Sequence, residues 1–184
     1  VIAFFFVFIL ILGLLTAYFL MPPINSMSPL VWKKKTLWAY ALLLIISIWV
    51  IYASNITPVM ADIYLKLGIA QERSYRWNEA TRLVNRAIEI DPDEETYYLN
   101  LGRILFGKAN TSNDLNEKNA IFEKIRETME RAHTLNPMNT DHTANLGLLY
   151  LRWAEFDLSP ESRQKKLRTA NRYFQQALER SPYE

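Results

Sequence analysis

Few side chains in this sequence could bind a metal or take part in catalysis. The chain has two histidines, His133 and His142, and no cysteine. A zinc site needs three or four converging ligands, which two histidines nine residues apart do not supply. The acidic run DPDEE at 91–95 lacks the spaced oxygens and mid-loop glycine of a calcium loop, and is typical of a turn before a helix. We therefore expect no metal, no cofactor and no catalytic residue in this chain.

Two charge-free runs indicate a membrane protein. Residues 1–20, VIAFFFVFILILGLLTAYFL, and residues 36–55, TLWAYALLLIISIWVIYASN, carry no charged side chain. Each run has the length of about 20 apolar residues that a helix needs to cross a bilayer. A signal peptide, the alternative for the first run, would begin with basic residues and end in a small-residue cleavage site. We predict membrane-spanning helices at 1–21 and 36–55.

The loop between these runs, residues 22–35, sets the expected topology. Its prolines break a helix, and its charges are Lys33, Lys34 and Lys35. Short basic loops stay in the cytoplasm, so the residues after Asn55 are expected outside it. The prediction is a multi-pass protein of the inner or plasma membrane with an extracytoplasmic domain. If the lysines only end the apolar segment and contact water, they do not determine the orientation of the helices in the membrane.

The residues after the second run are numerous enough for one folded domain. Without the three loop lysines, 18 basic and 19 acidic residues remain, a net charge of −1. This balance argues against a nucleic-acid-binding protein, which needs a clustered basic face. Because the chain begins at Val1 inside an apolar run and stops two residues after Pro182, we expect it to be a piece of a longer polypeptide.

Small residues and prolines recur at fixed spacing in this part of the chain. Alanines at 87, 132 and 177 and prolines at 92, 137 and 182 are each 45 residues apart, and glycines at 68, 102 and 147 are 34 and 45 apart. A glycine inside a helix costs about 1 kcal/mol, which is tolerated where a second helix must approach closely. The apolar residues between these marks follow a helical period. The pattern predicts six antiparallel helices in three pairs.

This pattern resembles the tetratricopeptide repeat, a helix–turn–helix unit with Leu-Gly, Tyr, Ala and Pro at set positions. The first unit here has Tyr64, Leu67, Gly68, Ala80, Ala87 and Pro92. The resemblance implies an all-α fold, with two transmembrane helices followed by an α-solenoid over 61–184. Its three units would cover 61–94, 95–139 and 140–184.

Two departures from the family pattern affect the packing. The second and third units each hold eleven extra residues between glycine and alanine. At 3.6 residues per turn this is about three whole turns, so the insert can be shared between two helices without rotating the packing face. Ile125 replaces the usual small residue, which we expect to loosen that contact.

The family geometry also implies a concave groove lined by the first helix of each unit. The residues expected there are Leu65, Ile69, Arg73, Leu99, Arg103, Phe106, Leu148, Leu151 and Arg152. This mixture of apolar side chains and arginines suits a protein or peptide, or the flank of the chain's own membrane domain. The alternative is that these are ordinary surface residues.

Two spanning helices, a basic loop and external repeats together resemble the O-antigen ligase and polymerase superfamily, some members of which carry tetratricopeptide repeats after their last helix. The resemblance implies that this chain is an anchor and recognition arm, because the family's catalytic residues belong to an upstream external loop that is absent here. Whether the whole protein is an enzyme stays open. The alternative is a scaffold or assembly subunit, such as a cytochrome c maturation factor, although that family has a longer loop between the helices.

Overall fold

The computed structural model describes Gly13, Trp38, residues 41–50 and residues 52–180. The chain divides into two compact units, Val1–Ile56 and Thr57–Glu184. Every regular element in the described ranges is helical. The all-α prediction is therefore confirmed.

In the first unit, residues 41–50 form a helix and Tyr52–Ile56 form a π-helical turn, η1. The predicted span at 1–21 and the loop at 22–35 lie outside the described residues, apart from Gly13, and the span at 36–55 is described in part. None of the described helices is both long enough and apolar enough to cross a bilayer. The two transmembrane helices therefore have no support from the structure.

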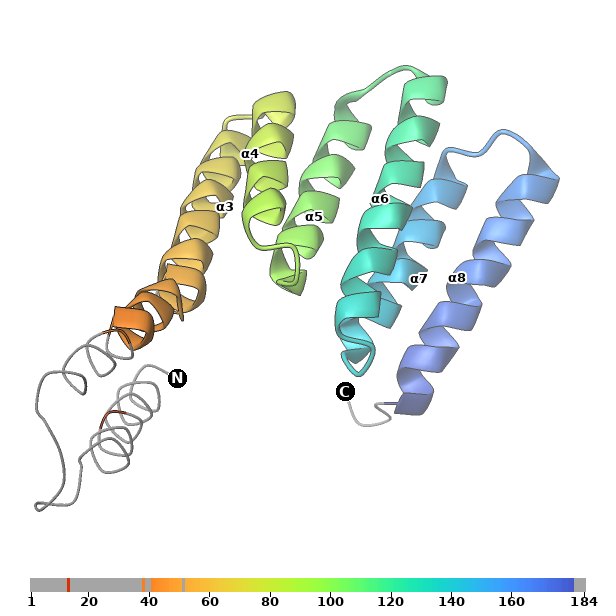
Figure 1. The fold of residues 1–184 in the computed structure, drawn as a ribbon. Coiled ribbons are helices and arrows are strands. Elements are labelled where there is room, and N and C mark those ends of the chain that lie inside the picture. Colours follow the sequence, from red (N-terminus) through yellow and green to blue (C-terminus); the bar gives the residue numbers. More distant parts are fainter. Residues whose placement is uncertain (1–12, 14–37, 39–40, 51, 181–184) are drawn as a thin grey trace, which may run out of the picture. The chain divides into compact units, whose positions relative to one another are not determined.

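Six helices make up the second unit. Their bounds are α3 Thr57–Arg73, α4 Trp77–Ile90, α5 Glu95–Thr111, α6 Leu115–Leu135, α7 Thr140–Glu155 and α8 Pro160–Arg180. Each consecutive pair, α3 with α4, α5 with α6 and α7 with α8, forms an antiparallel hairpin (Figure 1). The hairpins contact one another through α4 and α5 and through α6 and α7.

Side-chain caps explain where several helices begin. The side chains of Glu94, Asp114 and Asn139 each accept a hydrogen bond from the backbone N–H two residues later, at 3.0, 2.8 and 3.0 Å. Such a cap satisfies one of the N–H groups that a helix start leaves without a partner. The last helix starts at Pro160, whose missing N–H costs nothing in the first turn, and Ser159 Oγ accepts from Ser162 N.

Small residues let the two helices of a hairpin approach closely. A Cβ atom on Gly68 would lie 2.6 Å from Val84 Cγ2 and 3.2 Å from the Ala80 carbonyl oxygen, and one on Gly147 would lie 2.7 Å from Phe174 Cε1. The alanines expected at close contacts are buried at 80, 87, 132 and 170. Ala177 is only half-buried, because no described helix covers that side of α8.

Aromatic side chains join the second and third hairpins. Phe122 of α6 stacks on Trp153 of α7 at 5.7 Å between ring centroids, and meets Phe106 of α5 edge-on at 5.8 Å. Trp153 Nε1 donates to Asn119 Oδ1 at 2.8 Å, so its polar atom is satisfied. Ile125 is fully buried beside this cluster. A Cβ atom on Gly102 would meet only the Met129 side chain, at 3.2 Å, and no backbone atom of α6, so the contact beside Ile125 is looser than the one at Gly68, as expected.

The extra residues of the second hairpin are added as whole turns. Nine residues separate Gly102 from the end of α5, against five between Gly68 and the end of α3. Ten residues separate the start of α6 from Ile125, against three between the start of α4 and Ala80. The additions of four and seven residues are about one and two turns. The packing face is unchanged, and only the tip of the hairpin grows.

We expect the two alanines that begin and end the repeat pattern to respond differently to a large side chain. Ala87→Phe places a ring where the native residue is completely buried, so the free energy of unfolding should fall by about 1–3 kcal/mol. Ala177→Phe, at a half-exposed site, should cost less than 1 kcal/mol by the same principle. Denaturant unfolding of both variants checks this; equal losses would contradict the described packing of α8.

Candidate functional site

The predicted groove residues divide between the core and the surface. Leu65 is buried, Ile69 and Phe106 are half-buried against the core, and Leu99 is half-buried. The first helix of each hairpin packs both on its partner helix and on a neighbouring hairpin, which takes up these apolar side chains. The exposed members are Arg73, Arg103, Leu148, Leu151 and Arg152.

Two of the exposed arginines have carboxylate partners within the chain. Arg103 lies 2.9 Å from Glu72 and donates to Asn100 Oδ1 at 3.0 Å. Arg152 lies 3.3 Å from Glu155. An incoming anionic group would have to compete with these carboxylates. The binding role of this surface stays a prediction.

A hollow of about 500 Å³ lies at the tips of the first two hairpins. One wall is the turn from α3 to α4, and the other is the C-terminal end of α5 with the first turn of α6. We call this hollow the tip step. Its lining residues are Tyr75, Arg76, Trp77, Asn78, Glu79, Lys108, Thr111, Ser112 and Glu117.

Tyr75 closes α3 in a conformation that normally belongs to glycine. The Arg76 N–H donates to Gln71 O at 3.0 Å and the Tyr75 N–H to Glu72 O at 2.8 Å, which is the hydrogen-bond pattern of a Schellman C-cap. Tyr75 has φ 57°, and no other non-glycine residue in the described ranges has a positive φ. A side chain in this left-handed region costs about 1–2 kcal/mol. The turn therefore holds a strained residue at its centre.

The strained turn presents an aromatic ring to solvent. Tyr75 is 75% exposed and meets Trp77 edge-on, with ring centroids 5.7 Å apart. Trp77 packs against α5, where a Cβ atom on Gly107 would lie 2.4 Å from the indole ring. The indole is thus fixed by the second hairpin, and the phenol ring stands above it.

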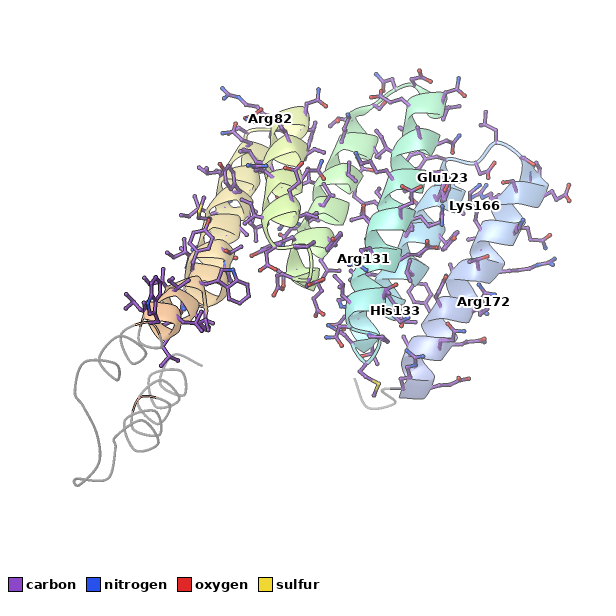
Figure 2. The ribbon with its side chains drawn as sticks, viewed as in Figure 1. Arg82, Glu123, Arg131, His133, Lys166 and Arg172 are labelled. Atoms are coloured by element: carbon purple, nitrogen blue, oxygen red, sulfur yellow. The ribbon has the colours of Figure 1, made fainter. Side chains whose placement is uncertain are left out.

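The tip step is lined by two cations, Arg76 and Lys108, and two carboxylates, Glu79 and Glu117. Glu79 is held by Arg82 of the same helix, whose hydrogen bond lowers the pKa of Glu79 (Figure 2 labels Arg82). Glu117 accepts a hydrogen bond from Ser112 Oγ. Among the described residues Arg76 and Lys108 form no ion pair within 4 Å, although the charge of Arg76 also lowers the pKa of Glu79, and Lys108 Nζ donates to Asn78 Oδ1 at 2.9 Å. Two cations therefore flank the aromatic pair.

A second polar cluster lies at the other end of the hairpins, where α6 turns into α7. His142 is buried, with Nε2 3.4 Å from Glu95 Oε1, and neither of its ring nitrogens has a hydrogen-bond partner. His133, near the end of α6 (Figure 2), has a buried Nδ1 that is also unpartnered. Burial lowers the pKa of His133, assisted by the charges of Arg180 and His142. Over the described ranges, no group of histidine and acidic side chains could hold a metal ion.

The sequence reasoning did not identify the tip step. A signal that could have indicated it is the aromatic pair in RSYRW, which has a tyrosine where a helix end usually has glycine. The other wall, at Lys108, comes from a helix some thirty residues further along the chain, which no local pattern connects to Tyr75.

No family model matches the sequence, and no curated protein matches it.

We expect Tyr75→Gly to leave the fold intact or to make it more stable. Glycine adopts positive φ without a steric cost, which offsets the lost contact with Trp77, so the free energy of unfolding should rise by up to about 1 kcal/mol. Denaturant unfolding measures this, with Tyr98→Gly inside α5 as a control that should lose stability. A marked loss for Tyr75→Gly would show that the ring is needed for folding.

The lowered pKa of His133 predicts a stability that depends on pH. The unfolded chain takes up the proton first, so stability is complete above the unfolded pKa and falls as the pH drops through it. Between pH 7.5 and 5.5 the His133→Gln variant should lose less stability than the native chain, by at most about 1.4 kcal/mol per pH unit. Denaturant unfolding at both pH values tests this; parallel losses would assign the acid sensitivity to other groups.

Proposed function

We propose that this chain is a membrane-anchored helical-repeat module that binds a segment of a partner protein at the tip step. One observation carries the proposal. Tyr75 is kept in a strained, largely exposed conformation in a hollow that it shares with two cations, Arg76 and Lys108, neither of which forms an ion pair within 4 Å. Strained residues cost stability and persist at positions where they serve function. A stability role is a poor account of Tyr75, because glycine would close α3 at lower cost.

The lining of the tip step indicates the chemistry of the segment. Tyr75 and Trp77 offer a large, rigid aromatic surface that loses little conformational entropy on binding. Arg76 can form paired hydrogen bonds to a carboxylate, and Lys108 has further N–H groups to donate. An extended acidic segment that packs an apolar side chain on the two rings satisfies all of these groups. The stacked hairpins hold the site rigid, so binding costs little ordering of the domain.

The membrane part of the proposal is supported by the sequence. The charge-free runs at 1–20 and 36–55 and the basic loop between them favour a multi-pass anchor with the helical domain extracytoplasmic. The 45-residue spacing of alanines and prolines supports a tetratricopeptide-like unit. By its resemblance to O-antigen ligase-like proteins, the module would be the recognition arm of a glycan-transfer protein. A reading frame that continues upstream through further hydrophobic segments would support this, whereas an initiator just before Val1 would favour the assembly-subunit alternative.

The tip step is expected to cross-link to its partner in cells. In one variant of the full chain, a photoreactive phenylalanine replaces Tyr75. In a separate control variant it replaces Tyr98, which lies outside the tip step. Light should give a discrete cross-linked band from position 75, identified by mass spectrometry. Arg76→Glu with Lys108→Glu should weaken this band at least tenfold, because like charge would repel an acidic segment.

A matched pair of charge reversals on α6 controls for net charge. Lys124→Glu with Arg131→Glu changes two exposed cations away from the tip step (Figure 2 labels Arg131) and should leave the band intact. Arg103→Glu with Arg152→Glu tests the predicted groove. If only the groove reversal removes the band, the first helices are the binding surface and the tip step is not. If no reversal changes it, recognition is not charge-dependent and the acidic segment is excluded.

A further inference from the structure

The outer face of α3 carries a stripe of exposed apolar side chains. The stripe consists of Val59, Met60, Ile63 and Leu67, which are 58%, 41%, 51% and 46% exposed. At 3.6 residues per turn, these positions fall within an arc of about 100°. The opposite face of the same helix holds Ala61, Leu65 and Gly68, which are buried. The hairpin therefore packs without the stripe, and α3 is apolar on a face that its own domain does not cover.

The helix on the other flank of the second unit is different. One exposed side of α8 carries Lys165, Arg168 and Arg172, which suit contact with water (Figure 2 labels Arg172), although Leu167 and Leu178 are also exposed elsewhere on this helix. An uncovered helix in this domain is therefore not apolar as a rule. Burying these four apolar side chains of α3 against another surface would be favourable by roughly 25 cal/mol for each Å² removed from water.

The sequence around the stripe indicates a lipid surface as the cover. No charged residue occurs from Thr36 to Ala61, so the charge-free run continues past the predicted span into α3. The first charge after it, Asp62, is engaged by the Tyr97 hydroxyl, which donates to Oδ1 at 3.0 Å. The next, Lys66, lies about 70° from the stripe's centre line and has no ion-pair partner in the described ranges. An apolar stripe with cations along its edge is the pattern of a helix that lies in an anionic membrane interface.

We propose that α3 lies along the bilayer surface with Val59, Met60, Ile63 and Leu67 in the interfacial layer and Lys66 and Arg73 at the lipid headgroups. The inference rests on the membrane anchoring proposed above. From Val59 to Leu67 the stripe rises about 12 Å along the helix axis. Each headgroup layer is roughly 5–8 Å thick, so a helix standing upright could not bury the whole stripe there. The helix must therefore be inclined. Its opposite face, with Ala61, Leu65 and Gly68, packs against the rest of the domain above the bilayer.

The absence of cysteine from the sequence makes a direct test possible. Single-cysteine variants of the full chain are labelled with an environment-sensitive fluorophore and reconstituted into vesicles of phosphatidylethanolamine and phosphatidylglycerol. The stripe is probed by Ile63→Cys and Leu67→Cys, the anchor by Leu44→Cys, and the water-exposed control is Leu158→Cys in the turn before α8, which is 82% exposed. Nitroxide-labelled lipid is then added to the same vesicle composition.

The expected result is a blue-shifted emission at Ile63 and Leu67 that the nitroxide lipid quenches by at least half, with Leu158 unchanged. Quenching at Leu44 without quenching at Ile63 and Leu67 would contradict the proposed contact between α3 and lipid, while still supporting the membrane anchor. A blue shift at the stripe without quenching would show a protein cover, either a second copy or a partner, and would also overturn it. Absence of quenching at Leu44 as well would remove the anchor and the inference with it. Circular dichroism of each variant confirms that the helices are retained.

Discussion

The close approach of two helices at a glycine is the constraint on which this domain depends. At Gly68 the facing helix leaves no room for a single Cβ atom, since both a side chain and a backbone carbonyl oxygen lie in its place. At Gly147 the ring of Phe174 occupies the same position in the third hairpin. Close contact excludes water along the whole hairpin and lets the small alanines of the second helix be buried. The helix propensity lost at each glycine is small beside the burial that it permits.

This constraint also limits how a hairpin can grow. Residues added between the glycine and its facing position must come in whole turns on each helix, or the contact face rotates away. The second hairpin meets the condition with four residues on α5 and seven on α6. Growth is therefore confined to the tip, where the end of α5 and the start of α6 form one wall beside the shorter first hairpin. The tip step follows from this difference in length, and Trp77 fills part of it by packing over Gly107.

The repeating helices could be predicted from the sequence. Side-chain burial that depends on neighbouring helices could not. The helical period and the spacing of alanines and prolines located the six helices, because each mark has a local physical cause. Leu65, expected in a groove, lies in the core, and Ile69 and Phe106 are partly buried against it, which the residue types alone do not predict. Ala177 matches Ala87 in sequence yet is half-exposed, since burial depends on the next helix and not on the residue type. The backbone angle of Tyr75 has no signature beyond the absence of a glycine.

Features that stabilise the domain and features that cost stability are unevenly distributed over its hairpins. The aromatic cluster around Phe122 and Trp153 joins the second and third hairpins, which are also the longer ones. Most ion pairs in the described ranges join residues three or four apart on one helix, such as Arg126 with Glu123, and exposed pairs of this kind contribute little to stability. The first hairpin is shorter, carries the strained Tyr75 and leaves an apolar face of α3 uncovered. Features that cost stability are thus concentrated in the hairpin that packs on the longer second hairpin. A stack in which each hairpin packs on the next allows this, because the loss in one hairpin is offset by the interface with its neighbour.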